Sequence, residues 1–227
     1  MGQPRISQLQ TWDRHVELVL TVLVRALAIL QSRVGSTDSE ISLNRELYLC
    51  LLDANREVYA STGEAFDHAP TPEGKNPPDA DDLQRVLRED KIPDFYWGFI
   101  DHSAINPRSG VRNFVIECKR LGKPTRADWV FNENYINHGV LRFVTKVYGY
   151  AKGEKEGAMV GYVQSMDFGD ILIEVNRTAT GVSVAELEGP DGGWQLGGTS
   201  NLHHNLTRPF KISPFYLQHW WVDIRSA

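Results

Sequence analysis

Three side chains between Lys91 and Leu121 have the types and spacing needed for metal-dependent phosphate chemistry. They are Asp94, which follows a proline, and Glu117 and Lys119, which are two residues apart. Two carboxylates can hold a hard divalent cation through oxygen, and an ammonium group beside them can orient or help deprotonate an attacking water and offset developing phosphate charge. The set therefore predicts hydrolysis of phosphodiester bonds.

A β-hairpin is expected to position these side chains. Residues 95–101 and 112–121 are rich in aromatic and β-branched residues, and the interval between them contains the turn dipeptides Asn-Pro and Ser-Gly. Side chains two residues apart on a strand share a face, so Glu117 and Lys119 are expected to point the same way.

The pairing of the two strands decides which aspartate belongs to the site. If Asp101 lies opposite Arg112, antiparallel pairing places Asp94 opposite Lys119 and leaves Asp101 roughly 20 Å away, at about 3.3 Å per residue. Asp94 is therefore the preferred ligand. The alternative interpretation is an exposed Glu-x-Lys ion pair worth under about 1 kcal/mol. The Pro-Asp dipeptide, the apolar run before the glutamate and the basic residues after it favour the catalytic interpretation.

Pro93-Asp94, a hairpin-length interval and Glu117-Cys118-Lys119 resemble the core motif of the PD-(D/E)XK nuclease superfamily, which includes restriction endonucleases, resolvases and repair nucleases. The resemblance implies that Asp94, Glu117 and the backbone carbonyl of Cys118 bind Mg²⁺ or Mn²⁺. It implies that Lys119 serves the water. The fold class expected is α/β (α+β): the resemblance implies a restriction-endonuclease-like mixed β-sheet flanked by helices, and the residue pattern adds an N-terminal helical hairpin.

The same resemblance suggests two accessory residues. Many members carry a glutamate on a helix before the core, and Glu46 is the candidate chosen over Glu40 and Glu57 on the same predicted helix. Arg142 fits the polar or basic position on the helix after the Glu-x-Lys strand.

The resemblance further implies a magnesium-dependent endodeoxyribonuclease in a bacterial restriction or anti-phage system, acting as a homodimer or beside a partner subunit. One alternative is a non-catalytic nuclease-like subunit that binds nucleic acid or a partner protein. Another is an unrelated α/β structural protein in which Asp94, Glu117 and Lys119 form a surface ion network.

Composition is consistent with one intracellular domain. The chain has 227 residues, 41% of them hydrophobic, which is enough for a substantial core. Cys50 and Cys118 have no metal-binding spacing, so a reducing cytoplasm is expected. The most apolar stretch, Val16–Leu30, is interrupted by Glu17 and Arg25, so no membrane span is expected.

Net charge limits the surface that nucleic acid could contact. A charge of −5 and a pI near 5.8 disfavour a nonspecific coat protein, because phosphate neutralisation needs a broad basic surface. Contact with DNA is therefore expected at a local patch, drawn from Arg112, Arg120, Lys123, Arg126, Arg142 and Lys146.

The chain divides into a helical pair at 1–60, a loop at 61–80 and a catalytic core at 81–227, all in one domain. Apolar residues three and four apart predict a first helix from Leu9 to Leu30, and a capping box at Thr37 predicts a second. Four prolines between residues 61 and 80 predict a surface loop.

Further elements are expected along the core. The predicted helices cover 81–90, 134–150 and 168–178, and the predicted strands cover 157–163, 182–187, 194–198 and 215–224. His203-His204-Asn205 is expected to be a polar loop, since a zinc site that also uses His219 would need a chance tertiary arrangement.

Overall fold

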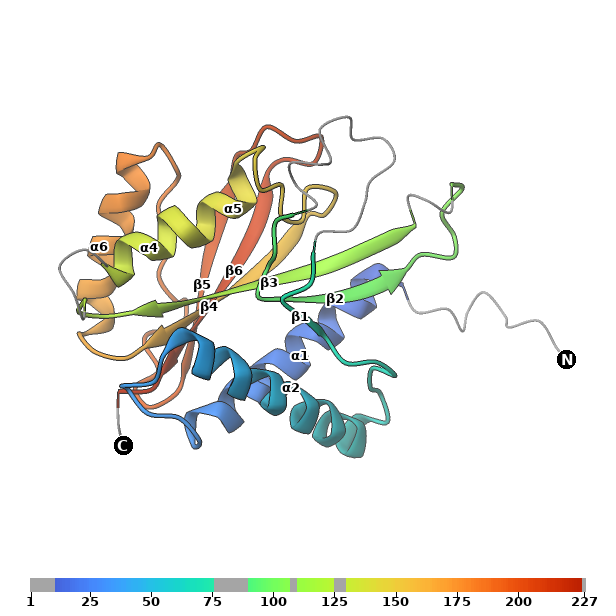
Figure 1. Cartoon of the computed structure of the whole chain (residues 1–227), viewed down its shortest axis with the longest axis horizontal. Coiled ribbons are helices and arrows are strands. Elements are labelled where there is room, and N and C mark those ends of the chain that lie inside the picture. The colour runs from blue at the N-terminus through green and yellow to red at the C-terminus, as the bar shows by residue number, and fades with distance from the viewer. Residues whose placement is uncertain (1–10, 76–89, 107–109, 125–129, 226–227) are drawn as a thin grey trace, which may run out of the picture.

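The computed structural model describes residues 11–75, 90–106, 110–124 and 130–225. These residues form a six-stranded mixed sheet with helices on both faces (Figure 1), which confirms the expected mixed α/β class. The strands are β1 (Thr71–Pro72), β2 (Phe95–Ile100), β3 (Val111–Leu121), β4 (Glu156–Val163), β5 (Thr199–Leu206) and β6 (Phe215–Asp223).

The sheet has a parallel centre and antiparallel edges. Its order is β1-β2-β3-β4-β6-β5, in which β3, β4 and β6 run parallel. Strands β1, β2 and β5 pair antiparallel with their neighbours. Strand β4 is buried from residue 157 to 163, which explains its unbroken run of small and apolar residues. A Cβ at Gly161 would lie 2.5 Å from Leu121 Cδ1, so this position admits no side chain.

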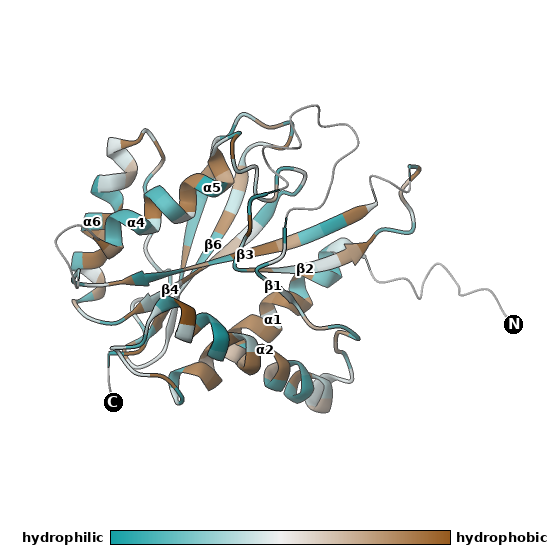
Figure 2. Ribbon diagram, in the orientation of Figure 1, coloured by the Kyte–Doolittle hydropathy of each residue, from teal (hydrophilic) through white to brown (hydrophobic). Residues whose placement is uncertain are grey.

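Helices α1 (Trp12–Gln31) and α2 (Glu40–Thr62) pack together and cover one face of the sheet (Figure 1). Apolar side chains spaced three and four apart on α1 point into this core, and Figure 2 shows brown, hydrophobic residues recurring along both helices. The N-cap of α2 is Ser39 rather than Thr37, and its hydroxyl accepts a hydrogen bond from Ser42 N at 3.1 Å. Glu40 is consequently the first residue of α2, where the helix dipole favours an acidic side chain.

The other face of the sheet is covered by the helices that follow β3 and β4. They are α4 (Phe131–Tyr135), the π-helical turn η3 (Ile136–Val140), α5 (Leu141–Val144) and α6 (Phe168–Gly181). Gly139 brings η3 close to the sheet, because a Cβ there would lie 2.6 Å from Met159 Cε and 3.3 Å from Lys119 Cγ. The missing side chain therefore lets this helical segment pack directly against Lys119.

Two expected boundaries are wrong. The helix expected over 134–150 begins earlier, at Phe131, and ends at Val144, because Thr145 adopts an extended backbone. The loop expected from residue 61 is shortened at its start by the last turn of α2, and residues 71–72 form β1 inside it. The helix expected over 81–90 falls almost entirely on residues outside the described ranges.

The C-terminal hairpin is also different from the expectation. Residues 182–187 and 194–198 form no strand, and the partner of β6 is β5, at 199–206. Part of β5 was expected to be a polar loop. The alternation of buried Ser200, Leu202, His204 and Leu206 shows that the histidine takes an interior strand position.

Candidate functional site

The last part of β3 has one edge that no strand covers among the described residues. Strand β2 begins at Phe95, which pairs with Ile116, so the antiparallel ladder ends there. On the other side, β3 stays paired with β4 through Leu121. Backbone groups of residues 117–121 that face away from β4 therefore need partners other than a strand.

Two carboxylates provide those partners. The backbone N–H of Cys118 donates to Asp94 Oδ2 at 2.7 Å, and that of Arg120 donates to Glu40 Oε2 at 3.3 Å. Asp94 comes from the residue before β2, and Glu40 from the first turn of α2. The unpaired strand edge thus fixes two acidic side chains beside it.

The ammonium group of Lys119 lies among the oxygen atoms of this edge. Its Nζ is 2.7 Å from the carbonyl oxygen of Cys118 and 2.9 Å from Glu40 Oε1. It is also 3.0 Å from Glu117 Oε1 and 3.8 Å from Asp94 Oδ2. The fold therefore brings together Asp94, Glu117, Lys119 and the Cys118 carbonyl, which the sequence had singled out.

Arg142 joins the cluster from α5. Its Nη1 lies 2.5 Å from Glu117 Oε1 and 3.5 Å from the hydroxyl of Tyr150, and its guanidinium carbon is 5.5 Å from the ring centre of Tyr148. Glu117 Oε2 and Arg142 Nε are buried and have no hydrogen-bond partner among the described residues. A water molecule or a ligand would satisfy these two atoms.

Burial and charge shift the proton affinities of the cluster. Burial, followed by the charge of Asp94, raises the pKa of Glu117 to about 8. Burial also raises the pKa of Asp94, against the attraction of Lys119. Burial alone would lower the pKa of Lys119, but Glu117, Asp94 and Glu40 outweigh it and raise that pKa. In the metal-free protein Lys119 therefore carries a proton, and Glu117 is mostly protonated at neutral pH.

A short chain of hydrogen bonds orients Asp94. The side-chain amide of Asn44 donates to Asp94 Oδ1 at 3.0 Å, and the buried hydroxyl of Tyr162 donates to Asn44 Oδ1 at 2.9 Å. Both oxygens of Asp94 thus accept a hydrogen bond from a fixed donor. Sequence reasoning missed Asn44 and Tyr162, because nothing in the spacing of these residues links α2 to β4.

The acidic residue that α2 brings to the site is Glu40, which corrects the choice of Glu46. Glu46 Oε1 lies 3.4 Å from Arg33 Nη1. The two glutamates are six helical positions apart, about 9 Å along the axis and on different faces. The signal that could have identified Glu40 is the helix start, since a cap at Ser39 puts Glu40 in the first turn.

The hairpin register differs from the expectation by two residues. Phe99, rather than Asp101, pairs with Arg112, which brings Asp94 level with Glu117. Asp101 lies at the far end of the hairpin, where its carboxylate accepts a hydrogen bond from Ser103 N at 2.9 Å.

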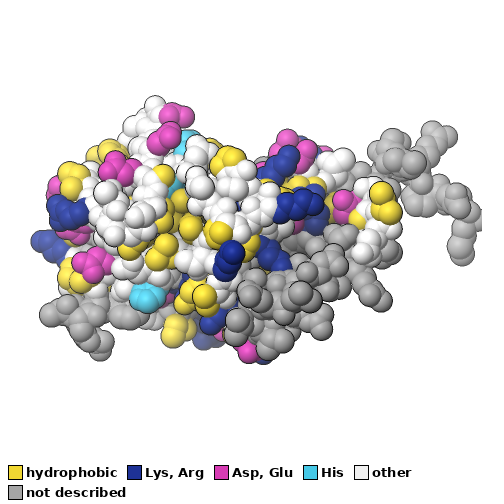
Figure 3. Space-filling model, turned by 90° about the horizontal axis from the view of Figure 1, so that it is seen from above, with side chains coloured by type: hydrophobic (Ala, Val, Ile, Leu, Met, Phe, Trp, Pro, Cys, Tyr) yellow, Lys and Arg dark blue, Asp and Glu magenta, His cyan; other side chains and the backbone are white. Residues whose placement is uncertain are grey.

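The basic residues expected to contact nucleic acid have different surroundings. The guanidinium carbon of Arg120 lies 4.3 Å from the ring centre of Phe131, whereas the side chains of Lys123 and Lys146 are exposed. Arg126 lies outside the described residues. In Figure 3, Lys and Arg side chains lie right of the middle and at the left edge of the face shown, with Asp and Glu side chains beside and between them.

The histidines near the C-terminus bind to other protein groups. The buried His204 ring lies 2.6 Å from the Ala185 carbonyl oxygen through Nε2, and His219 Nδ1 lies 2.7 Å from the hydroxyl of Tyr135. His203 pairs through Nδ1 with the hydroxyl of Tyr216. In the described ranges, no three or more His, Cys, Asp or Glu side chains form a group that could hold a metal ion.

A magnesium ion would instead need a mixed donor set, and the residues at the β3 edge fit that requirement. Asp94, Glu117 and the Cys118 carbonyl supply three oxygens, the atom type that Mg²⁺ prefers. One of them, Glu117 Oε2, is buried without a partner among the described residues. The Cys118 carbonyl accepts a hydrogen bond from Lys119, and the two oxygens of Asp94 accept hydrogen bonds from Cys118 N and Asn44, so a bound ion would share these oxygens with those donors.

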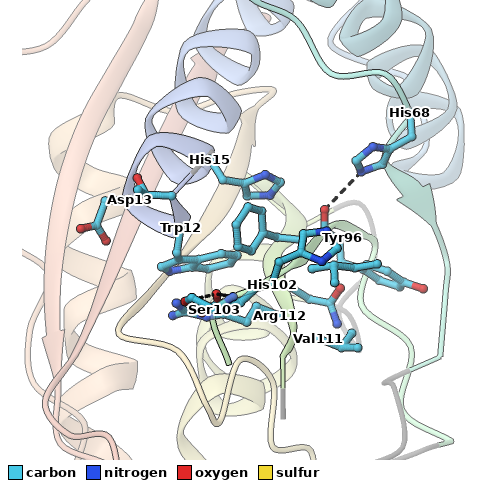
Figure 4. A pocket seen from close by; sticks show the side chains of 15 residues that line it. Trp12, Asp13, His15, His68, Tyr96, His102, Ser103, Val111 and Arg112 are labelled. Carbon is cyan, nitrogen blue, oxygen red and sulfur yellow. Dashed lines mark hydrogen bonds between the residues drawn. The ribbon is translucent and has the colours of Figure 1, made fainter. Parts of the chain in front are cut away.

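A pocket of about 920 Å³ lies apart from this cluster, at the far end of the β2–β3 hairpin. Trp12, His15, Phe99 and Arg112 are among the residues that line it, and Asp94 and Glu117 are not. Figure 4 shows the Trp12 indole with Arg112 on one side and His15 on the other, and His68 turned toward the Gly98 carbonyl. The aromatic faces here are thus largely occupied by the protein's own side chains.

Among the described residues, no helix has the length and apolar character needed to cross a membrane. Comparison with known proteins found no matching family model, no matching curated protein and no matching solved structure.

Proposed function

We propose that this chain is a Mg²⁺-dependent nuclease of the PD-(D/E)XK type that hydrolyses phosphodiester bonds in DNA, within a bacterial restriction or anti-phage system. The observation that carries the proposal is the convergence of Asp94, Glu117 and the Cys118 carbonyl on Lys119 at the β3 edge. The order of elements also supports it, because a hairpin is followed by a helical crossover into a parallel strand.

In the proposed enzyme, Asp94, Glu117 and the Cys118 carbonyl would hold the ion. A bound Mg²⁺ would supply Lewis-acid polarisation of the phosphate and a more acidic water. Glu117 must release its proton to serve as a ligand, and its pKa of about 8 allows this at neutral to alkaline pH. The side-chain amide of Asn44 orients the carboxylate of Asp94 through a hydrogen bond.

Lys119 acts in the proposal as a hydrogen-bond donor. In the metal-free protein its pKa is raised by Glu117, Asp94 and Glu40, so it carries a proton there. A fixed ammonium group can orient the attacking water and stabilise negative charge on the phosphate in the transition state. Arg142, whose Nε has no partner in the described part of the chain, adds a second positive charge beside Glu117.

Cleavage assays test the proposal. Purified protein with Mg²⁺ or Mn²⁺ is expected to cut labelled single- or double-stranded DNA, and Glu117→Ala and Lys119→Ala are each expected to slow cleavage by at least about 100-fold. Glu46→Ala is the matched control and should leave the rate unchanged, because Glu46 pairs with Arg33 on α2's other side. The proposed nuclease activity is refuted if neither DNA nor RNA is cleaved, or if both site variants keep full activity.

One observation favours a second candidate, the non-catalytic nuclease-like subunit. Lys119 already contacts the Cys118 carbonyl oxygen and Glu117 Oε1, so the site is partly neutralised by the protein itself. A non-catalytic subunit would be folded and would show no Mg²⁺ or Mn²⁺ binding by calorimetry. The enzyme is expected to bind the ion and to lose that binding in Glu117→Ala.

A further inference from the structure

A group of one ring and two cations lies beside the carboxylate cluster. Lys91 Nζ is 5.1 Å from the ring centre of Tyr148, and the guanidinium carbon of Arg142 is 5.5 Å from the same centre. Lys91 precedes Asp94 by three residues, and Tyr148 lies in the turn after α5. The ring therefore joins two segments that each also carry a residue of the candidate site.

The two cations differ in how their charge is balanced. Arg142 pairs with Glu117, but no ion pair involving Lys91 occurs in the part of the chain that the structure describes. The neighbouring acid, Asp90, is taken by Lys75 at 2.8 Å. A cation–π contact at a partly exposed site contributes only about 0.5–1 kcal/mol, so it positions Lys91 without neutralising it.

Two like charges held on one ring favour an anion between or beside them. Lys91 and Arg142 are both partly exposed, so a ligand can reach them from solvent. Arg142 pairs with Glu117 and still keeps 23% of its side chain exposed at the same place. The planar guanidinium and the flexible ammonium are the two side-chain groups that bind phosphate most readily.

We propose that Lys91, Tyr148 and Arg142 form a phosphate subsite that binds a backbone phosphate of the nucleic acid next to the one at Asp94 and Glu117. This inference rests on the proposed function for the identity of the ligand. Lys91 and Arg142 contact the phosphate oxygens, and the ring of Tyr148 sets the spacing between the two cations.

Binding without cleavage tests this subsite separately from the enzyme. Fluorescence anisotropy of a labelled 12-nucleotide strand and a 12-base-pair duplex is measured in EDTA over a range of salt concentrations. The logarithm of the association constant falls as the logarithm of the salt concentration rises. Lys91→Gln is expected to make this slope shallower by about 0.7 for the strand or about 0.9 for the duplex, the value for one lost phosphate contact. Arg177→Gln, which removes one exposed positive charge on α6, should leave the slope unchanged.

Two further arms identify the ligand and the role of the ring. Inorganic phosphate at constant ionic strength should compete with the strand if the subsite accepts a free phosphate, and should fail to compete if it accepts only a diester. In either case Lys91→Gln must lower the affinity for the bound species. Tyr148→Phe keeps the ring and should bind normally, whereas Tyr148→Leu should weaken binding several-fold.

The proposal is overturned if the wild type binds neither phosphate nor nucleic acid, or if Lys91→Gln and Arg177→Gln have the same slope. If binding depends on Lys91 but no cleavage occurs with Mg²⁺ or Mn²⁺, the phosphate subsite is supported and the proposed nuclease activity is refuted. Circular dichroism of each variant shows whether it remains folded, which is expected because Lys91 and Tyr148 are only partly buried.

Discussion

Two groups of buried charge lie at opposite ends of β3, and they differ in how completely their atoms are paired. At the start of the strand, Arg112 binds both carboxylate oxygens of Glu154, and the nearby Arg208 donates to carbonyl oxygens that include Ile212 O at 2.9 Å and Ala151 O at 2.9 Å. Near the end of the strand, the cluster around Lys119 leaves buried polar atoms without partners among the described residues.

The difference separates a structural role from a functional one. Removing ions from water is costly, and a folded protein recovers that cost only when the buried groups are fully hydrogen-bonded. Arg208 meets this condition and ties residues 150–154 to the loop after β5. The Lys119 cluster does not, and incomplete pairing of shifted groups in one place is typical of a binding or catalytic site.

The largest expected effect is that changing the Arg208 cluster lowers stability, whereas changing the Lys119 cluster removes cleavage. Arg208→Met should lower the free energy of unfolding by about 3 kcal/mol, because it removes a buried cation and leaves several carbonyl oxygens unpaired. Glu117→Gln should leave that free energy unchanged or raise it, since a neutral amide of the same shape costs less to bury.

Urea unfolding in EDTA measures both variants, and the cleavage assay is run on the same preparations. Glu117→Gln should abolish cleavage, whereas Arg208→Met should cut at a near-normal rate at temperatures where it stays folded. Equal losses of stability in the two variants would mean that both clusters are structural.

Much of the fold that carries this contrast was predictable from local sequence. β2 and β3 were located by their aromatic and β-branched residues, and the Glu-x-Lys spacing put Glu117 and Lys119 on one face. The register was wrong by two residues, because it depends on loop geometry that turn dipeptides alone do not determine.

The unpredicted parts are contacts between distant segments. Glu40 reaches Lys119 across 79 positions of the chain, and Tyr162 reaches Asn44 across 118. No local pattern encodes such pairs, since they depend on how α2 packs over the sheet. β5 was missed because its interior position at His204 is polar in type, although that histidine is fully buried.

The next prediction uses pH to distinguish the two clusters. Glu117 has a pKa of about 8 in the folded protein and an ordinary value of 4.5, so between these values the folded state binds more protons than the unfolded state. Stability in EDTA should therefore fall as pH rises from about 5 to 8, by no more than about 1.4 kcal/mol per pH unit for this group. Asp94, whose pKa is also raised, contributes with the same sign.

Arg208 should not contribute to the pH dependence of stability between about pH 5 and 8. Burial lowers its pKa only to about 10, so it stays charged through pH 8. Thermal unfolding at a series of pH values, with and without Mg²⁺, gives the measurement. Glu117→Gln should flatten the profile, and Mg²⁺ should stabilise the wild type more at pH 8 than at pH 6. A wild-type profile that rises over this range would show that Glu117 is ionised in the folded protein.

The smallest effects are expected from the hydrogen bonds that orient Asp94. Asn44→Ala removes the donor to Asp94 Oδ1 and leaves the hydroxyl of Tyr162 without its acceptor, so Mn²⁺ affinity should fall about 10-fold, as for other residues that orient metal ligands. Tyr162→Phe removes only the outer hydrogen bond, from Tyr162 to Asn44, and should lower the Mn²⁺ affinity a few-fold, with about 1 kcal/mol lost in stability.

Calorimetric titration of Mn²⁺ into each variant measures the affinities, and equal stability losses without any change in affinity would assign both residues to packing alone. Graded losses of affinity would instead show that the cluster near the end of β3 is organised to present Asp94 to a ligand, which has no counterpart in the fully paired cluster of Arg112 and Glu154.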